Sequence, residues 1–227
     1  MNLDELDALI RVAAITTLLL LAWLLLRNPR QIGLPSFLFA PMALCLSCFV
    51  ITNTPAQVLR LTGLSGRLAH DASGFTVIFL WWFCLSCFDM RFRPRGGILA
   101  VGLIWGVIAA FDRGLFGQAF ADKGLSRFLV ALGFGIVGHL VWSLMAERSG
   151  DLIERRHDAR IAVAAVLGGM LFIDLAADTL FGFAWRPMGF AMSQNIMILG
   201  FGLCWPARYL RCARTYSPSM QGQFRFA

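Results

Sequence analysis

The chain alternates between long apolar stretches and short polar connections. Seven apolar stretches are each roughly one bilayer long: 8–26, 36–51, 75–88, 97–111, 128–146, 161–182 and 188–205. A helix rises about 1.5 Å per residue, so roughly 17–25 mostly apolar residues cross a hydrocarbon core of about 30 Å. The pattern predicts an all-α fold, a polytopic membrane bundle of seven transmembrane helices. Because stretches 75–88 and 97–111 are short, we expect their helices to extend into flanking residues.

Composition supports this assignment. The chain is 58% hydrophobic, well above the roughly 45–50% of an ordinary soluble domain. Seven spans and their connections use nearly all of the 227 residues, so no separate soluble domain fits. We therefore predict a transmembrane domain over residues 1–210 and a short basic cytoplasmic tail over 211–227.

The distribution of basic residues predicts an orientation. The odd-numbered connections and the C-terminal segment carry 13 of the 20 lysines and arginines, and the even-numbered connections carry 6. Arg11, just inside the first stretch, accounts for the last one. Positive residues favour the cytoplasmic side, so we expect the N-terminus outside and the C-terminus in the cytoplasm of a bacterial inner membrane. The net charge of +7 is spread over loops, which favours orientation and lipid headgroups over nucleic acid as its cause.

Two connections carry structure of their own. In the external segment 55–73, leucines alternate with arginines in a pattern that suits a short interfacial helix. The internal segment 148–160 is the most charged part of the chain. Its acidic and basic residues stand at i,i+4 spacing, which predicts that a helix projects into the cytoplasm there. A solvated turn at the headgroup level is the equally weighted alternative.

Ionisable and amide side chains within the spans are the best candidates for a functional site, because a charge in lipid is costly. Asp174 and Asp178 share one face of the sixth stretch, in the outer half of the membrane. The seventh stretch brings Gln194 and Asn195 to a similar depth, and His139 of the fifth lies somewhat below. We hypothesise that these residues line a polar cleft that opens to the outside and either binds a small ligand or responds to protonation. The alternative is interhelical hydrogen bonding, with Asp178 reaching toward Arg186.

The pentapeptide Cys-Leu-Ser-Cys-Phe occurs twice, at 45–49 and at 84–88. Each C-x-x-C pair puts two thiols on one helical face, as a zinc site requires. The helical rise places the two pairs roughly 10 Å apart in depth, against a Zn–S bond of about 2.3 Å. We therefore predict no metal site and interpret these cysteines as packing residues.

Small residues predict close helix contacts. Gly102 and Gly106 form a G-x-x-x-G on the fourth stretch, and Gly133, Gly135 and Gly138 cluster on the fifth. These contacts could lie inside the bundle or between two protomers.

Several function classes are excluded or lack support. Retinal requires a buried lysine for its Schiff base, and the only lysine, Lys123, is in an external loop. The sequence has no phosphate-binding glycine loop, no H-E-x-x-H and no nucleophile elbow. We expect no enzymatic activity and no cofactor.

Two segments carry a resemblance. Residues 83–95, FCLSCFDMRFRPR, resemble the close of the third helix in membrane-bound AraC-type bacterial regulators, and residues 150–160, GDLIERRHDAR, resemble an internal loop of theirs. In that family a multi-helix membrane domain precedes a cytoplasmic helix-turn-helix domain. The resemblance implies a sensory membrane domain over roughly residues 8–210. Only about twenty residues follow the seventh stretch, too few for a helix-turn-helix module, so we expect no direct nucleic acid binding.

We therefore expect a sensor or signal-relay module that acts through protein contacts, either with a membrane-protein partner or as a homo-oligomer. Its cytoplasmic contact surface would consist of basic residues on two internal connections, namely Arg91, Arg93, Arg95, Arg155, Arg156 and Arg160. An accessory subunit packed against a larger membrane complex is the alternative, and a small transporter is a weaker one.

Overall fold

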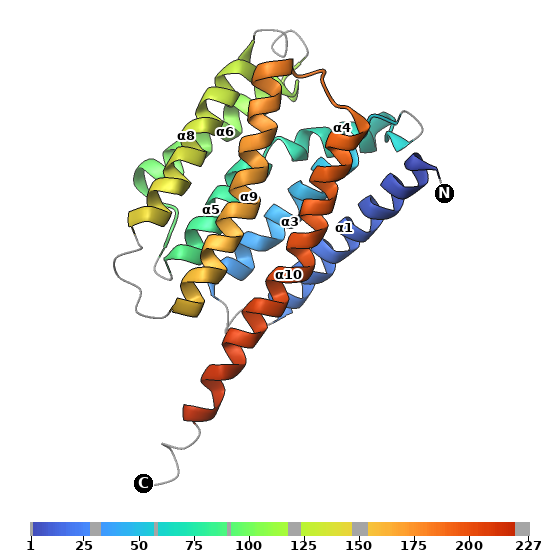
Figure 1. Ribbon diagram of the computed structural model, residues 1–227. Coiled ribbons are helices and arrows are strands. Elements are labelled where there is room, and N and C mark those ends of the chain that lie inside the picture. Colours follow the sequence, from blue (N-terminus) through green and yellow to red (C-terminus); the bar gives the residue numbers. More distant parts are fainter. Residues whose placement is uncertain are drawn as a thin grey trace.

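The computed structural model describes residues 2–27, 33–56, 59–89, 92–117, 124–146 and 154–220, and of 154–161, 164 and 205–220 it describes the backbone alone. Within these residues all regular secondary structure is helical, which confirms the predicted all-α class. The helices are α1 (Leu3–Arg27), α3 (Leu34–Thr52), α4 (Gly63–Ser73), α5 (Thr76–Phe88), α6 (Gly96–Asp112), α8 (Leu125–Ala146), α9 (Glu154–Phe181) and α10 (Met188–Met220). Figure 1 shows a bundle in which α1 begins at one end and α10 leaves at the other.

Each of the seven predicted apolar stretches coincides with a helix or lies within one, to within a residue. By length and composition α1, α3 and α8 are each able to cross a membrane. The bent pair α4 and α5, which meet at 43°, is a fourth candidate span, while α6 and the segment 188–204 of α10 are shorter apolar helices. The described residues thus hold three or four candidate spans by this criterion, as in a membrane protein.

The two short stretches behave differently from each other. Helix α6 gains one residue at each end of the predicted 97–111. Helix α5 gains none, and its 13 residues rise only about 20 Å. Only together with α4, which is bent from it by 43° and packs against α3, does α5 reach the length of a candidate span.

Other boundaries shift from those predicted. The helix expected within 55–73 begins only at Gly63, whose positive φ of 71° starts the turn into α4. The sixth helix extends back to Glu154, so the segment 154–160 is helical rather than a turn. The seventh helix does not end at 205 but continues to Met220, beyond the rest of the bundle (Figure 1).

Large apolar side chains cover much of the outer surface as well as the core. Trp23 of α1 is 56% exposed and Trp142 of α8 is 73% exposed. Extended apolar surface of this kind marks contact with a partner or a membrane. In a bundle of apolar helices, lipid is the solvent that accepts it.

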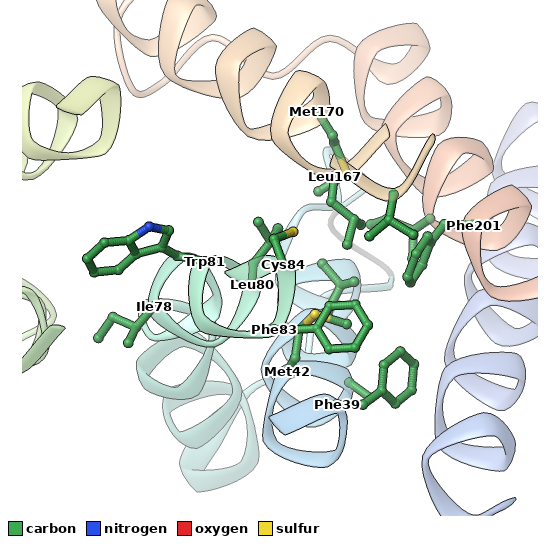
Figure 2. Packing of buried hydrophobic residues seen from close by; sticks show 14 of the residues in the cluster. Phe39, Met42, Ile78, Leu80, Trp81, Phe83, Cys84, Leu167, Met170 and Phe201 are labelled. Carbon is green, nitrogen blue, oxygen red and sulfur yellow. The ribbon is translucent and has the colours of Figure 1, made fainter. Parts of the chain in front are cut away.

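The core is one buried cluster to which α1, α3, α5, α6, α8, α9 and α10 all contribute. Figure 2 shows the part of it that lies between α3, α5, α9 and α10. Phe39 and Phe83 are fully buried, and their rings meet edge to face with centroids 5.4 Å apart. Phe201 of α10 lies 6.4 Å from Phe39 on its other side. Helix α5 occupies the middle and contacts α3, α6, α8 and α9.

The predicted small-residue contacts lie inside the bundle at two positions. A Cβ at Gly102 would lie 2.3 Å from the indole of Trp82 on α5, and one at Gly133 would lie 2.8 Å from Leu175 on α9. Nothing lies within 4 Å of a Cβ built at Gly135 or Gly138. Glycine at 102 and 133 therefore permits close helix packing within one protomer.

Candidate functional site

Asp174 and Asp178 share a face of α9, as their spacing predicts, and both contact Arg186 in the connection to α10. Arg186 Nη1 donates to Asp174 Oδ1 at 2.5 Å, and Nη2 donates to Asp178 Oδ1 at 3.0 Å. All three side chains are largely buried. The contact of Asp178 with Arg186, which belongs to the alternative of interhelical hydrogen bonding, is therefore present. Asp174 shares the same guanidinium.

Gln194 brings α10 to this ion pair. Its Nε2 donates to Asp174 Oδ1 at 2.8 Å, and its Oε1 accepts a 2.5 Å hydrogen bond from Asn53 Nδ2. Gln194 is 2% exposed. The inference that Gln194 and Asp174 lie at one depth agrees with this geometry.

Asn195 faces α1 instead. Its Nδ2 lies 3.3 Å from Asp7 Oδ1, and Asp7 accepts a 2.6 Å hydrogen bond from Arg11 Nε. The guanidinium of Arg11 also donates to the backbone carbonyls of Val50 and Asn53, the latter at 2.7 Å. A charged pair with several hydrogen bonds is how a membrane protein keeps ionised groups inside its helices.

These contacts form one connected set across α1, α3, α9 and α10. We call it the interhelical network, and its members are Asp7, Arg11, Asn53, Asp174, Asp178, Arg186, Gln194 and Asn195. The two halves join at Asn53, whose carbonyl accepts from Arg11 while its side chain donates to Gln194. A change at the α9–α10 end therefore has a hydrogen-bonded route to α1.

Sequence reasoning missed Asp7, Arg11 and Asn53. Asp7 directly precedes the first apolar stretch, where a solvated residue is the ordinary expectation, but it is fully buried. The available signal was the i,i+4 spacing of an acid and a base in an otherwise apolar helix. Asn53 directly follows α3, outside the predicted apolar stretch 36–51.

His139 lies apart from the interhelical network. Its Nδ1 accepts a 3.3 Å hydrogen bond from Trp81 Nε1, and the two rings meet at 89°. Ser143 Oγ lies 3.5 Å from the same nitrogen. Among the described residues these are its side-chain partners, so the structure does not bring His139 to Asp174.

A cavity of about 860 Å³ adjoins the network at Asp178 and Arg186. Its walls come from α3, α4, α6, α8, α9 and the segments that join them. The charged and polar residues that line it are Thr52, Asn53, Thr54, Arg60, His70, Ser73, Asp112, Arg113, Ser126, Asp178 and Arg186. The cavity lies at the end of the bundle where α10 begins.

The predicted cytoplasmic contact residues are only partly described. Arg93 and Arg95 are exposed and line a depression of about 940 Å³ beside Phe37 and Phe92. Arg91 lies outside the described residues. Arg155, Arg156 and Arg160 are in the first turns of α9, where the backbone alone is described. Both segments lie at the end of the bundle from which α10 emerges (Figure 1).

The two C-x-x-C pairs do not gather into a ligand set. Cys84 is buried in the core beside Leu80 (Figure 2), and Cys45 is buried on α3. In the described ranges no three His, Cys, Asp or Glu side chains come close enough together to hold a metal ion.

Comparisons with protein-family models, with curated proteins and with solved structures find no match to this chain. The resemblance to membrane-bound AraC-type regulators therefore rests on its two short motifs. The arrangement of the interhelical network, the cavity and α10 carries the functional argument that follows.

Proposed function

We propose that this protein is a sensor or signal-relay module of the bacterial inner membrane, with seven transmembrane helices, that acts through protein contacts. One observation carries the proposal: the helix that supplies Gln194 and Asn195 to the buried network continues unbroken to Met220. A change in the hydrogen bonds of the network at one end of the bundle would therefore alter the position of α10, which leaves the bundle at the other end.

The coupling has a physical basis in the rigidity of a helix. The 25 residues that follow Asn195, up to Met220, rise about 38 Å at about 1.5 Å each, more than the thickness of the hydrocarbon core. A small rotation or shift of α10 at the network would therefore be passed to its far end through Pro206 and Pro218, where the helix lacks a backbone hydrogen bond and bends most readily. Shifts of about 1–2 Å in such packed elements are a common form of switching.

The network offers a point where such a shift could start. Asp174 Oδ1 accepts from both Arg186 and Gln194, so any ligand or proton that weakens the first contact alters the second. Arg186 also borders the cavity of about 860 Å³, and a bound molecule there would compete with Asp174 and Asp178 for the guanidinium. A ligand shifts a conformational equilibrium through such differential contacts.

The proposed topology has the N-terminus outside and the C-terminus inside. It is supported by the arginine distribution, by helices over all seven apolar stretches, and by the position of the helix ends at opposite ends of the bundle. A green fluorescent protein fused after Ala227 should fluoresce, and alkaline phosphatase fused there should be inactive. An active phosphatase fusion would contradict this topology.

The relay is tested in the native host with Asp174→Asn, which keeps the shape of the side chain and removes its charge. Transcript profiles should differ between the variant and the wild type at equal membrane abundance. Ser193→Ala, an exposed neighbour of Gln194, is the matched control and should leave the profile unchanged. An unchanged profile for Asp174→Asn would remove the sensory role.

Purification in a mild detergent distinguishes the accessory-subunit alternative. As a relay, the protein should be recovered alone, as a homo-oligomer, or with a regulatory partner whose retention depends on Asp174. Constant stoichiometric recovery with one large membrane complex, in both wild type and Asp174→Asn, would favour the subunit role.

A further inference from the structure

We infer that the cavity beside Arg186 binds a small organic anion, whose oxyanion group is held by Arg113 and Arg60 and whose apolar body fills the rest. The inference deepens the proposed function and rests on it for its biological meaning, since it names the class of signal that the sensor would detect.

The first argument is that Arg113 has no carboxylate among its described hydrogen-bond partners. Its Nη1 lies 2.8 Å from His70 Nδ1 and 3.2 Å from the His70 carbonyl oxygen. Arg186, by contrast, is paired with two aspartates, and Arg11 with one aspartate and two carbonyls. Arg113 keeps an Nη2 group with no such contact, which is half of the planar fork that binds carboxylate or phosphate.

Arg60 faces the same cavity from the segment before α4. Its Nε donates to the Thr54 carbonyl at 3.1 Å, which fixes the root of the guanidinium and leaves its two terminal nitrogens for another partner. Two guanidinium groups from different segments are thus available at one cavity. A pair of this kind suits an oxyanion with several acceptor lone pairs.

The acidic residues of the cavity are already engaged. Asp178 is paired with Arg186, and Asp112 Oδ1 accepts a 2.6 Å hydrogen bond from Ser126 Oγ. Burial lowers the pKa of Arg113, Asp112, Asp71 and Asp178 oppose this shift, and the charge of Arg186 adds to it. An anion at Arg113 would offset both destabilising effects.

Thr54 supplies an independent observation. It lines the cavity and is 4% exposed, and its Oγ1 has no hydrogen-bond partner in the described part of the protein. Buried hydroxyl groups nearly always have a partner. Since Arg60 Nε contacts the carbonyl of the same residue, an acceptor bound beside Arg60 would supply the partner that this hydroxyl lacks.

The remaining wall of the cavity is apolar, so the part of the ligand beyond its oxyanion group should be apolar too. Trp105, Leu129 and Leu175 line it, and Trp105 is held in place by its Nε1 donating to the Gly74 carbonyl at 3.0 Å. A volume of about 860 Å³ falls within the roughly 300–1,000 Å³ of small-molecule sites. An inorganic ion would leave this apolar part unfilled, so an organic anion fits better.

The test uses the full chain purified in nanodiscs of phosphatidylcholine, with benzoate as the probe and isothermal titration calorimetry as the measurement. Benzyl alcohol, which has the ring without the charge, is the ligand control. Arg113→Gln and Arg60→Gln are the test variants, and Arg67→Gln, exposed on α4 and outside the cavity lining, is the matched control.

We expect saturable benzoate binding to the wild type and to Arg67→Gln. Each test variant should weaken it about tenfold or more, as the loss of a charge-assisted hydrogen bond predicts. Because Arg60 is exposed, its variant should fold even if Arg113→Gln does not. Equal binding of benzyl alcohol, equal binding by Arg60→Gln, or no saturable binding to the wild type would overturn the inference.

A second titration separates the two sources of such an anion. Adding phosphatidylglycerol to the nanodiscs should abolish benzoate binding if a lipid headgroup is the natural oxyanion, and leave it unchanged if a solute is. Both results support an oxyanion site at Arg113. Binding without any transcript response to Asp174→Asn would refute the relay alone, whereas the reverse result would refute the anion site alone.

Discussion

The side-chain amide of Gln194 donates a 2.8 Å hydrogen bond to Asp174 and so joins α10 to α9 inside the bundle. The same carboxylate oxygen accepts from Arg186, and the carbonyl of Gln194 accepts from Asn53 on the other side. Gln194 therefore connects the ion pair at the cavity to the half of the network around α1. Its removal should separate the two halves.

Gln194→Leu should lower the melting temperature of the purified protein, because it leaves Asn53 and Asp174 each short of one buried partner. Hydrogen bonds between membrane helices are worth roughly 0.6–2 kcal/mol each, so the expected loss is about 1–4 kcal/mol for the pair. Thermal unfolding followed by tryptophan fluorescence measures it. Ser193→Ala, one residue earlier and exposed, should match the wild type, and a stable Gln194→Leu would show that the two contacts contribute little.

Arg11→Met should be more severe. It leaves the fully buried carboxylate of Asp7 without its 2.6 Å partner and removes donors from the carbonyls of Val50 and Asn53. Breaking a buried ion pair from one side costs about 3–5 kcal/mol. We expect little folded protein in the membrane fraction, as measured by size-exclusion chromatography of a fluorescent fusion.

Asp4→Asn is the matched control for that experiment, since Asp4 is an exposed acidic residue on α1, one turn before Asp7. It should give a wild-type profile. The double variant Asp7→Asn, Arg11→Met should recover part of the folded peak because it removes the unpaired charge. Failure of Arg11→Met to reduce that peak would mean that Arg11 has little role in stability.

The apolar pattern predicts the helices well because each one must be apolar along its length to meet lipid and neighbouring helices. It also predicts that Asp174 and Gln194 share a depth, since a constant rise per residue converts sequence position into height. The depth of a residue does not determine which neighbouring helix its side chain faces. His139 has a suitable height and α8 contacts both α5 and α9, but the imidazole meets Trp81 of α5.

Charges at the ends of apolar stretches are harder to interpret. Asp7 and Asn53 lie where a solvated residue is the ordinary expectation, and only tertiary contact between α1, α3 and α10 buries them. The cavity is less predictable still. Arg60 and Arg113 come from two different connections, and their presence at one cavity depends on how α4 and α6 are placed, which no local pattern encodes.

The ion pair at the cavity should show energetic coupling. Arg186→Gln should lower stability by about 1.5–3 kcal/mol, the range for hydrogen bonds to charged groups. When combined with Asp178→Asn, its effect should shrink, because one of the two carboxylates that lose Arg186 is then neutral. A double-mutant cycle based on chemical denaturation in detergent measures this coupling.

The matched cycle pairs Arg186→Gln with Asp112→Asn. Asp112 lines the same cavity but accepts its hydrogen bond from Ser126, so the two substitutions should be nearly additive. An equal coupling energy in both cycles would indicate that Arg186 interacts with the overall charge of the cavity rather than with Asp178 specifically. It would also argue against Arg186 as the contact through which a ligand reaches Asp178.

The packing of α6 on α5 should depend on the absence of a side chain at Gly102. A Cβ there would lie 2.3 Å from Cζ2 of Trp82, a rigid indole held between the helices. Gly102→Ala should therefore destabilise the protein by about 1–3 kcal/mol, the usual cost of overpacking. At Gly135, where nothing lies within 4 Å, the same change should be neutral or stabilising, because alanine favours the helix by about 0.5–1 kcal/mol. Adding Trp82→Phe, which removes Cζ2, should restore part of the melting temperature of Gly102→Ala, and equal effects of alanine at 102 and 135 would contradict the close approach.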